Sequence, residues 1–228
     1  MIIGLWLLLT VLVMVPLMAR AKRRLLGASR TDWGRPWLNV LDGANRIFCR
    51  RFHRLHTMRV PLPAHGAALV VANHVSGLDP LLMIAACHRP LRFLIAREQY
   101  RRFGLQWLLR AVGCIPVDRA ASPHRALAAA RRALQQGEVV ALFPHGRIHL
   151  DHEGAVRLKP GIVHLAKLSD APVYPIRIDG VRGAGHTVSA VFQRSRAHLT
   201  ISSPLHYEEH SPERLLTDLA ERLSKRSH

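Results

Sequence analysis

A histidine and an aspartate five positions apart are the residues of this sequence best placed to do chemistry. Asn73-His74 follows the apolar run 67–72, and Asp79 precedes Pro80. This arrangement predicts that a buried strand delivers both residues onto a turn that opens a helix. A carboxylate that holds one imidazole nitrogen leaves the other to accept a proton from a substrate hydroxyl. The spacing therefore indicates a general base, His74, that Asp79 orients.

Asp79 also has a structural interpretation. Aspartate is a favoured N-cap and proline a favoured first helical residue, so Asp79-Pro80 could do no more than begin a helix. The two interpretations are compatible, because one carboxylate oxygen could cap backbone amides while the other orients His74. The pair alone does not decide between catalysis and capping.

The elements that would position this pair alternate along the chain after Pro61. Apolar runs predict strands near residues 67–72, 91–95, 113–117, 139–143, 172–178 and 197–202. Periodic segments predict helices near residues 80–88, 98–111, 123–136, 160–169 and 212–225. Ser122-Pro123 and Ser211-Pro212 each supply an N-cap and a first-turn proline, and Gly137 ends the third helix. This alternation predicts an α/β fold with a mixed, largely parallel sheet flanked by helices.

More polar residues follow the predicted strands, at the edge where α/β sheets build their sites. Arg97 and Arg119 could each bind a phosphate through the planar guanidinium fork, although strand-end arginines are also common on ordinary surfaces. Pro144-His145-Gly146 could expose backbone amides to an anion, or it could be an ordinary turn.

The segment after the fourth strand is rich in side chains that can bind metals. These are His145, His149, Asp151 and His152. The chain has fifteen histidines, so such groupings arise by chance, and no surrounding pattern imposes a tetrahedral geometry. We predict no metal site and interpret the histidines as exposed loop residues.

Residues 2–19 contain no charged side chain. At about 1.5 Å per residue, a helix of this length can just cross a hydrocarbon core. The positive charge follows this segment, at residues 20–24, which argues against a cleavable signal peptide and places the rest of the chain in the cytoplasm. We expect residues 1–24 to be a single-pass anchor in the cytoplasmic membrane, with the catalytic domain facing the cytoplasm. A signal peptide and a helix lying in the interface are the alternatives.

The charge of the chain is concentrated next to this segment. Eleven lysines and arginines but only two acids lie between Arg20 and Arg59. This stretch therefore carries a net charge of 11 − 2 = +9, half of the +18 of the whole chain. Residues 36–58 have the pattern of an amphipathic helix, so we expect region 25–60 to lie on anionic headgroups. No nucleic-acid-binding motif is present, and three widely spaced cysteines indicate reduced thiols.

Taken in order, these residues resemble the glycerolipid acyltransferases that include 1-acyl-glycerol-3-phosphate acyltransferase. Four blocks occur in the order of that family, within residues 60–205. They are Asn73-His74 with Asp79, Gly113 through Arg119, Phe143-Pro144-x-Gly146, and Val173-Tyr174-Pro175-Ile176. The resemblance implies a glycerol-3-phosphate acyltransferase-like fold for an acyltransferase domain at 61–228. Asn73, Gly113, Pro144 and Pro175 would be supporting residues.

The resemblance also implies a reaction, in phospholipid biosynthesis or remodelling. His74 would deprotonate the free hydroxyl of a lysophospholipid, most simply 1-acyl-glycerol-3-phosphate, which then attacks the thioester of acyl-CoA or acyl carrier protein. No cofactor and no metal would be needed, because a thioester is already activated. The implied partners are lipid headgroups and the acyl donor, with no nucleic acid. The acceptor would contact Arg119, Arg97, His145, Gly146 and Arg147.

The third block departs from the family pattern, which reads Phe-Pro-Glu-Gly-Thr-Arg. Here His145 replaces the glutamate, Arg147 the threonine and Ile148 the arginine. A histidine can donate a hydrogen bond or carry positive charge where a glutamate only accepts. An Arg-Ile pair resembles acyltransferases that act on lyso-phosphatidylethanolamine, so a different acceptor, such as an aminolipid, is the alternative. A basic membrane-tethered binding protein without catalysis is a more distant one.

Overall fold

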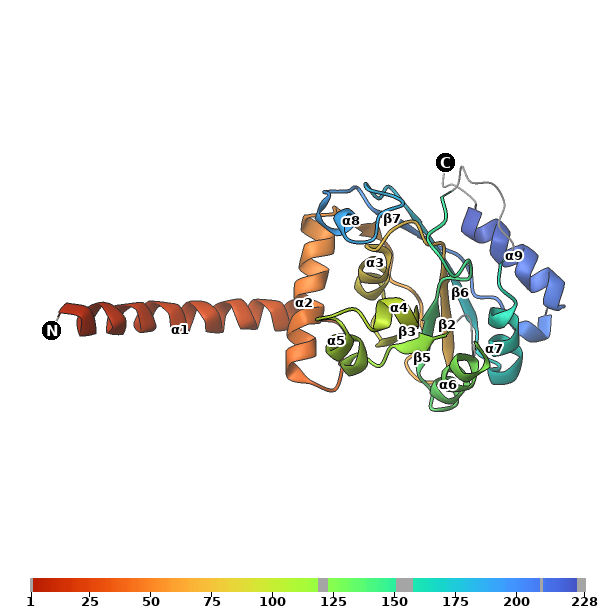
Figure 1. Ribbon diagram of the computed structural model, residues 1–228, viewed down its shortest axis with the longest axis horizontal. Coiled ribbons are helices and arrows are strands. Elements are labelled where there is room, and N and C mark those ends of the chain that lie inside the picture. Colours follow the sequence, from red (N-terminus) through yellow and green to blue (C-terminus); the bar gives the residue numbers. More distant parts are fainter. Residues whose placement is uncertain (1, 119–122, 151–157, 210, 225–228) are drawn as a thin grey trace.

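The computed structural model describes residues 2–118, 123–150, 158–209 and 211–224, without the side chains of residues 2–11, Pro123 and Glu209. Within these ranges one seven-stranded sheet lies between two layers of helices (Figure 1). Its strands are β1 (His56–Thr57), β2 (Ala68–Ala72), β3 (Leu91–Ala96), β4 (Ile115–Val117), β5 (Val139–Leu142), β6 (Val173–Asp179) and β7 (His198–Ile201). The predicted α/β class is confirmed.

The sheet has the strand order β1-β7-β6-β2-β5-β3-β4. Only β6 and β7 pair in antiparallel orientation, and all the other neighbours are parallel, as predicted. β2 is central, all five of its residues are buried, and it pairs with β5 and β6. The carboxyl ends of β2, β3, β5 and β6 therefore meet at one edge of the sheet. His74 follows β2 at this edge.

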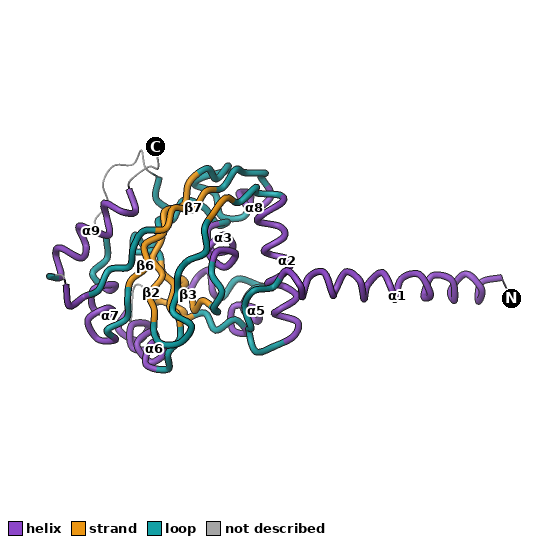
Figure 2. The backbone as a smooth tube through the Cα atoms, turned by 180° about the vertical axis from the view of Figure 1, so that it is seen from behind, coloured by secondary structure: helices purple, strands orange, loops and turns teal. Residues whose placement is uncertain are grey.

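Alternate residues of β2 face the two layers of helices. Val70 belongs to a core shared with α2 (Pro36–Arg51) and α3 (Asp79–Ala86), against which α5 (Gln106–Ala111) also packs. Leu69 and Val71 belong to a second core shared with α6 (Pro123–Gln135), α7 (Gly161–Ser169) and α9 (Pro212–Ser224). Figure 2 shows the strands between the two groups. This continuous apolar strand is what a sheet covered on both faces requires.

Two predicted helices differ from the observed ones. The helix expected at 98–111 is divided into α4 (Arg97–Tyr100) and α5 by a turn in which Gly104 has a φ of 79°. The amphipathic helix expected at 36–58 ends at Arg51, because Arg54 turns the chain with a φ of 47° and β1 follows. Neither α8 (Ser189–Phe192) nor the 3-10 helix η2 (Tyr207–Glu209) was predicted.

The predicted helix ends are partly confirmed. Ser211 Oγ accepts a hydrogen bond from Arg214 N at 3.3 Å, as expected of an N-cap before α9. Gly137 follows α6 with a φ of 74°, which glycine adopts without strain. Ser122, the cap predicted for α6, lies outside the described residues.

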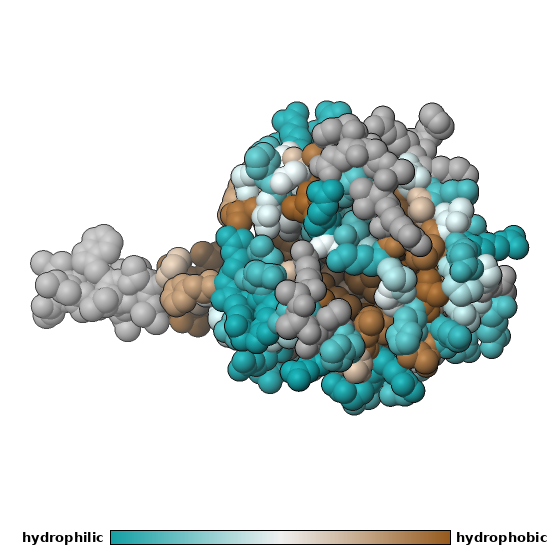
Figure 3. Space-filling view, turned by 45° about the vertical axis from the view of Figure 1, so that its right-hand side comes forward, coloured by the Kyte–Doolittle hydropathy of each residue, from teal (hydrophilic) through white to brown (hydrophobic). Residues whose placement is uncertain are grey.

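The first helix, α1 (Ile2–Ala28), projects away from the domain (Figure 1). Figure 3 shows that its part next to the domain is hydrophobic. Its exposed apolar side chains include Leu12, Val13, Met14, Val15, Leu17 and Met18. In the described part of the chain, no helix combines the length and the apolar character needed to cross a bilayer. The predicted membrane-spanning anchor is therefore not supported.

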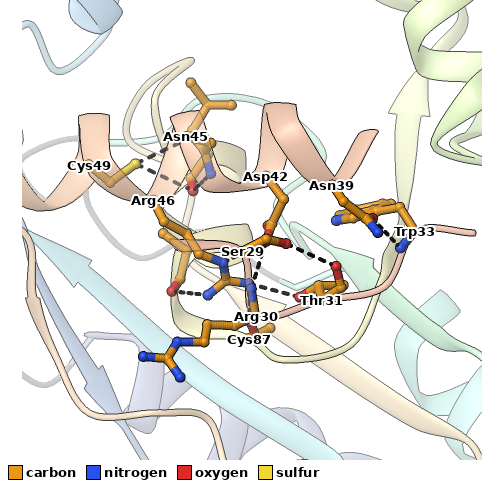
Figure 4. A network of polar contacts seen from close by, with 12 residues as sticks. Ser29, Arg30, Thr31, Trp33, Asn39, Asp42, Asn45, Arg46, Cys49 and Cys87 are labelled. Carbon is orange, nitrogen blue, oxygen red and sulfur yellow. Dashed lines mark hydrogen bonds and ion pairs between the residues drawn. The ribbon is translucent and has the colours of Figure 1, made fainter. Parts of the chain in front are cut away.

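A buried arginine joins α2 to α3. Arg46 pairs with Asp42 at 2.8 Å within α2 (Figure 4). Its guanidinium also donates to Ala85 O at 2.9 Å and to Cys87 O at 2.6 Å, at the carboxyl end of α3. Since buried charges need partners, these bonds hold the N-terminal helices in one position against the helix that begins with Asp79.

Candidate active site

His74 and Asp79 are in direct contact. His74 Nδ1 lies 2.8 Å from Asp79 Oδ2, and since a carboxylate only accepts, Nδ1 carries the proton and donates it. The Asp79 side chain is fully buried, whereas that of His74 is 19% exposed. Within the described ranges no residue hydrogen-bonds to His74 Nε2. The second ring nitrogen is therefore available to a ligand.

The carboxylate of Asp79 is fixed by the turn that precedes it. Its Oδ2 accepts from Val75 N at 2.7 Å and from Ser76 N at 2.8 Å, and its Oδ1 accepts from Ser76 Oγ at 2.8 Å. Four donors thus stabilise one buried charge, as burial requires. The proposed N-cap role is wrong: Asp79 is the first residue of α3, Leu78 is its N-cap, and the amides bound by Asp79 belong to the turn and not to the helix.

The His74 ring stacks on Phe143, which follows β5. The ring centroids are 4.0 Å apart and the planes differ by 15°. In addition, His149 N donates to His74 O at 2.7 Å. The ring is thus held by Asp79 at one nitrogen and by Phe143 on one face, which leaves the edge with Nε2 for a substrate.

Asn73, which precedes the histidine, serves the sheet. Its Nδ2 donates to Ile178 O at 3.0 Å and its Oδ1 accepts from Ile178 N at 2.7 Å. The side chain therefore continues the pairing of β2 with β6 beyond the last backbone pair. These bonds give Asn73 a structural role beside His74, and its role in catalysis stays a prediction.

The segment after β6 packs against the His74 turn. Gly77 N donates to His186 O at 3.1 Å and Gly185 N donates to Val75 O at 2.8 Å. A Cβ at Gly77 would lie 1.9 Å from Thr187 O, so only glycine fits there. This backbone contact fixes the turn from the side opposite β5.

The loop after β5 lies beside the ammonium group of Lys159. Gly146 has a φ of 72°, and its N–H donates to Phe143 O at 2.9 Å. A Cβ at Gly146 would lie 2.7 Å from Lys159 Nζ, so the ammonium crosses directly over the glycine. Lys159 N also donates to Pro144 O at 3.0 Å. The segment is thus a turn whose Gly146 amide is bonded to Phe143 O, with a cation beside it, and the predicted anion site stays a prediction.

The predicted arginines lie in different surroundings. Arg97 begins α4 and pairs with Asp118 at 2.6 Å, with its side chain 46% exposed. Arg147 is exposed on the loop after β5. Arg119, the predicted phosphate ligand, lies outside the described residues. Gly113 has a φ of 72°, and a Cβ there would collide with the Arg92 guanidinium, which explains why this position holds glycine.

Comparison with known proteins decides what this geometry belongs to. The family model described as Acyltransferase matches residues 51–179, more than half of the chain. The chain belongs to the acyltransferase family. Its matched region includes His74, Asp79, the loop after β5 and most of the sheet.

Individual acyltransferases agree with this assignment. A probable 1-acyl-sn-glycerol-3-phosphate acyltransferase of Mycoplasma genitalium is 33% identical over 122 residues, which cover 50% of this chain and 45% of that protein. The 1-acyl-sn-glycerol-3-phosphate acyltransferase of Bacillus subtilis is 24% identical over 169 residues, 72% of this chain and 81% of that protein. The match to the mycoplasma relative thus spans less than half of that protein.

A solved structure shares the fold. The crystal structure of the 1-acyl-sn-glycerophosphate (LPA) acyltransferase PlsC from Thermotoga maritima superposes with a TM-score of 0.65. The match covers 85% of this chain and 80% of that chain at 21% sequence identity. At this identity the likeness concerns the fold alone.

The sequence suggested that His145 and His149, near the acyltransferase site, are exposed loop residues, and the structure corrects this. His149 is buried, His145 is partly buried, and their rings stack with centroids 5.0 Å apart. In the ranges that the structure describes, no group of three potential metal ligands occurs. Asp151 and His152, the other members of the predicted cluster, lie outside those ranges.

The roles of three residues of the site were not predicted, although Phe143 belongs to the third sequence block. Ser76 binds Asp79, Phe143 supports the His74 ring, and Lys159 crosses Gly146. A serine three positions before Asp79 was a signal that could have been used, because Ser and Asp at this spacing often share hydrogen bonds in turns. Lys159 had no such signal, since it is thirteen residues from Gly146.

Proposed function

We propose that this protein transfers a fatty acyl group from acyl-CoA or acyl carrier protein to the free hydroxyl of a lysophospholipid, with 1-acyl-glycerol-3-phosphate as the acceptor. The observation that carries the proposal is the His74–Asp79 contact of 2.8 Å at the carboxyl end of β2, with Nε2 open to a ligand. The names of the relatives supply the acceptor class.

The proposed reaction needs only groups of this chain and the two substrates. Nε2 of His74 takes the proton of the acceptor hydroxyl while the hydroxyl oxygen attacks the thioester carbonyl. Asp79 stabilises the imidazolium that forms. As the tetrahedral intermediate collapses, the C–S bond breaks and the thiolate leaves with the proton from His74. The ester and the free thiol are the products, and His74 returns to its neutral form.

The acceptor phosphate is proposed to bind at the loop after β5. Lys159 places its ammonium over Gly146, and Arg147 follows Gly146 in the sequence. Arg97 begins α4, directly after β3 at the same edge of the sheet. Arg119 is proposed as a further ligand because of its position in the second sequence block. Cations in a site from which lipid excludes water bind a phosphate more strongly than they would on an open surface.

We propose that the enzyme works at the surface of the cytoplasmic membrane. Its acceptor would be a bilayer lipid, α1 exposes apolar side chains next to the domain, and basic residues are concentrated between Arg20 and Arg59. Anionic headgroups attract such a segment.

Product analysis tests the proposal directly. Purified protein is offered labelled acyl-CoA or acyl carrier protein together with a panel of lysolipids, and the products are identified by mass. We expect the acceptor to gain one acyl group in the wild type and none in His74→Ala, with both proteins equally folded. Full activity of His74→Ala would exclude His74 as the base, and no product with any acceptor would exclude the reaction.

The altered third block supports a second acceptor class. His145 stands where the family pattern has glutamate, and it stacks on His149 close to the His74 backbone. If this block selects the acceptor, His145→Glu changes the ratio of rates on lyso-phosphatidylethanolamine and 1-acyl-glycerol-3-phosphate. An unchanged ratio would show that position 145 does not select the acceptor.

A further inference from the structure

The turn between α4 and α5 exposes large apolar side chains. Residues 101–107 are all exposed, and among them Phe103 is fully exposed and Trp107 is 60% exposed. Gly104, with a φ of 79°, forms the tip of this turn. Burying an aromatic side chain is favourable, so leaving Phe103 in water forgoes stabilisation of the folded chain.

This turn is continuous with an exposed part of α2. The rings of Trp37 and Trp107 lie 5.5 Å apart at an angle of 36°. Leu41, one turn after Trp37, and Leu105, beside Phe103, are also more than 40% exposed. We call these five residues the aromatic platform: Trp37, Leu41, Phe103, Leu105 and Trp107.

Positive charge surrounds the aromatic platform. Arg101 and Arg102 precede Phe103, Arg110 follows Trp107, and Arg35 precedes α2, and all four are exposed. Apolar side chains edged by arginines match the boundary between acyl chains and anionic headgroups, where aromatic rings are favoured.

The position of the platform agrees with this match. α4 follows the carboxyl end of β3, so the turn lies at the sheet edge that carries His74. Both ribbon views place α5 beside α2, at the end of the domain from which α1 projects (Figures 1 and 2). The hydrogen bonds of Arg46 with Ala85 and Cys87 hold α2 against α3, which begins with Asp79.

We propose that the aromatic platform inserts into the surface of an anionic bilayer and is a lipid contact separate from α1. Phe103 and Trp107 enter the region of the first acyl carbons, and the arginines bind lipid phosphates. This contact orients the sheet edge so that His74 faces lipid. The proposal rests on the proposed function, because an enzyme acting on bilayer lipids needs its site at this depth.

Site-specific fluorescence tests the insertion without depending on catalysis. Cys49, Cys87 and Cys114 are buried, and burial raises the pKa of their thiols to about 12, 12 and 11, so they do not react at neutral pH. A polarity-sensitive NBD label can therefore be attached selectively to Phe103→Cys in the full chain. The matched control is Thr217→Cys on α9, an exposed position at the end of the domain away from α1 (Figure 1).

The vesicles contain equal parts of phosphatidylcholine and phosphatidylglycerol. We expect the label at 103 to brighten, shift to shorter wavelength and be quenched by nitroxide-labelled lipid, while the label at 217 does not change. An unchanged label at 103 overturns the proposal, whether the protein sediments with the vesicles or stays in solution. Equal changes at both positions would also overturn it.

A second measurement separates insertion from the reaction. Phe103→Ser should weaken partitioning to these vesicles roughly tenfold, whereas Leu168→Ser on α7 should change it by less than about twofold. Phe103→Ser should also lower the rate on a bilayer acceptor but not on a short-chain, water-soluble one. If the proposed reaction is wrong, no variant shows product, yet the fluorescence result still decides the insertion.

Discussion

Asn73 and Ile178 exchange two hydrogen bonds just beyond the point where the β2–β6 ladder ends. The amide nitrogen of Asn73 donates to Ile178 O at 3.0 Å, and its oxygen accepts from Ile178 N at 2.7 Å. The side chain thus takes the place of a backbone partner that the chain lacks because it turns away after Ala72. The first residue of the Asn-His block therefore fixes where the strand stops and where His74 begins the turn.

We expect Asn73→Ala to destabilise the protein by about 2–4 kcal/mol, because it leaves both polar groups of Ile178 buried without a partner. Urea unfolding measures the change. Asn45→Ala is the control, since it removes a partly buried bond to Leu81 O and a weak one from Cys49 Sγ, and it should cost about 1 kcal/mol. Unchanged stability with lost acyl transfer would instead indicate that Asn73 contacts substrate.

The buried carboxylate of Asp79 gives a graded prediction for catalysis. Asp79→Asn removes the charge that holds the imidazolium and should lower kcat by about 10²–10⁴-fold. Ser76→Ala removes one of four hydrogen bonds to that carboxylate and should lower kcat by roughly tenfold without raising KM. Steady-state kinetics with a saturating acyl donor measures both. A rise in KM alone would place Ser76 in acceptor binding and not in positioning Asp79.

The contact of Gly77 with Thr187 predicts a coupling between the His74 turn and the segment after β6. Gly77→Ala would put a Cβ 1.9 Å from a backbone oxygen, so one of the two segments must move, at a cost of about 1–3 kcal/mol. We expect a lower Tm together with a lower kcat. The control is Gly27→Ala in α1, whose Cβ would meet nothing within 4 Å. A lower Tm with full kcat would mean that the segment after β6 yields without disturbing His74.

The sequence was sufficient to predict the elements that a local pattern of apolar residues defines. The strand runs predicted the parallel sheet, and the apolar run before Asn73 with Pro80 after Asp79 predicted the turn between strand and helix. It was insufficient where one residue changes the chain direction. Gly104 divides the helix expected at 98–111, and Arg54, in a conformation that non-glycine residues rarely adopt, ends the one expected at 36–58.

Contacts between residues far apart in the sequence could not be predicted either, for a different reason. Nothing near Asn73 indicates that its partner is Ile178, 105 positions away, and nothing near Gly146 indicates the ammonium of Lys159. Such pairs depend on which strands become neighbours. The order of β2, β5 and β6 in the sheet emerges only when the whole chain packs.

Replacing one partner of the buried Asp42–Arg46 pair should destabilise the protein more than replacing both partners with apolar residues. Arg46→Met leaves Asp42 buried with only Ser29 Oγ and Arg30 N as partners, and it should destabilise the protein by about 3–5 kcal/mol. The double variant Asp42→Leu/Arg46→Met should recover part of that loss. Denaturant unfolding of the three proteins measures it. If the double variant is no more stable than the single one, the bonds of Arg46 to α3 carry the stability and not its pairing with Asp42.

His53 predicts a dependence of stability on pH. The residue is fully buried, its ring packs edge-on against the stacked rings of Phe48 and Phe52, and Nε2 donates to Val191 O at 3.0 Å. Burial lowers the pKa of His53 below its ordinary value of 6.5, and the bond to Val191 O only partly opposes this. The unfolded chain therefore binds more protons than the folded one as the pH falls through 6.5. The contribution of His53 to stability is complete above that pH and is lost below it, toward the folded pKa.

We expect His53→Gln, which can still donate to Val191 O but cannot be protonated, to lose less free energy of unfolding than the wild type between about pH 7.5 and pH 5.5. Urea unfolding at both pH values measures the difference, and equal losses in the two proteins would show that the buried ring takes up its proton without unfolding.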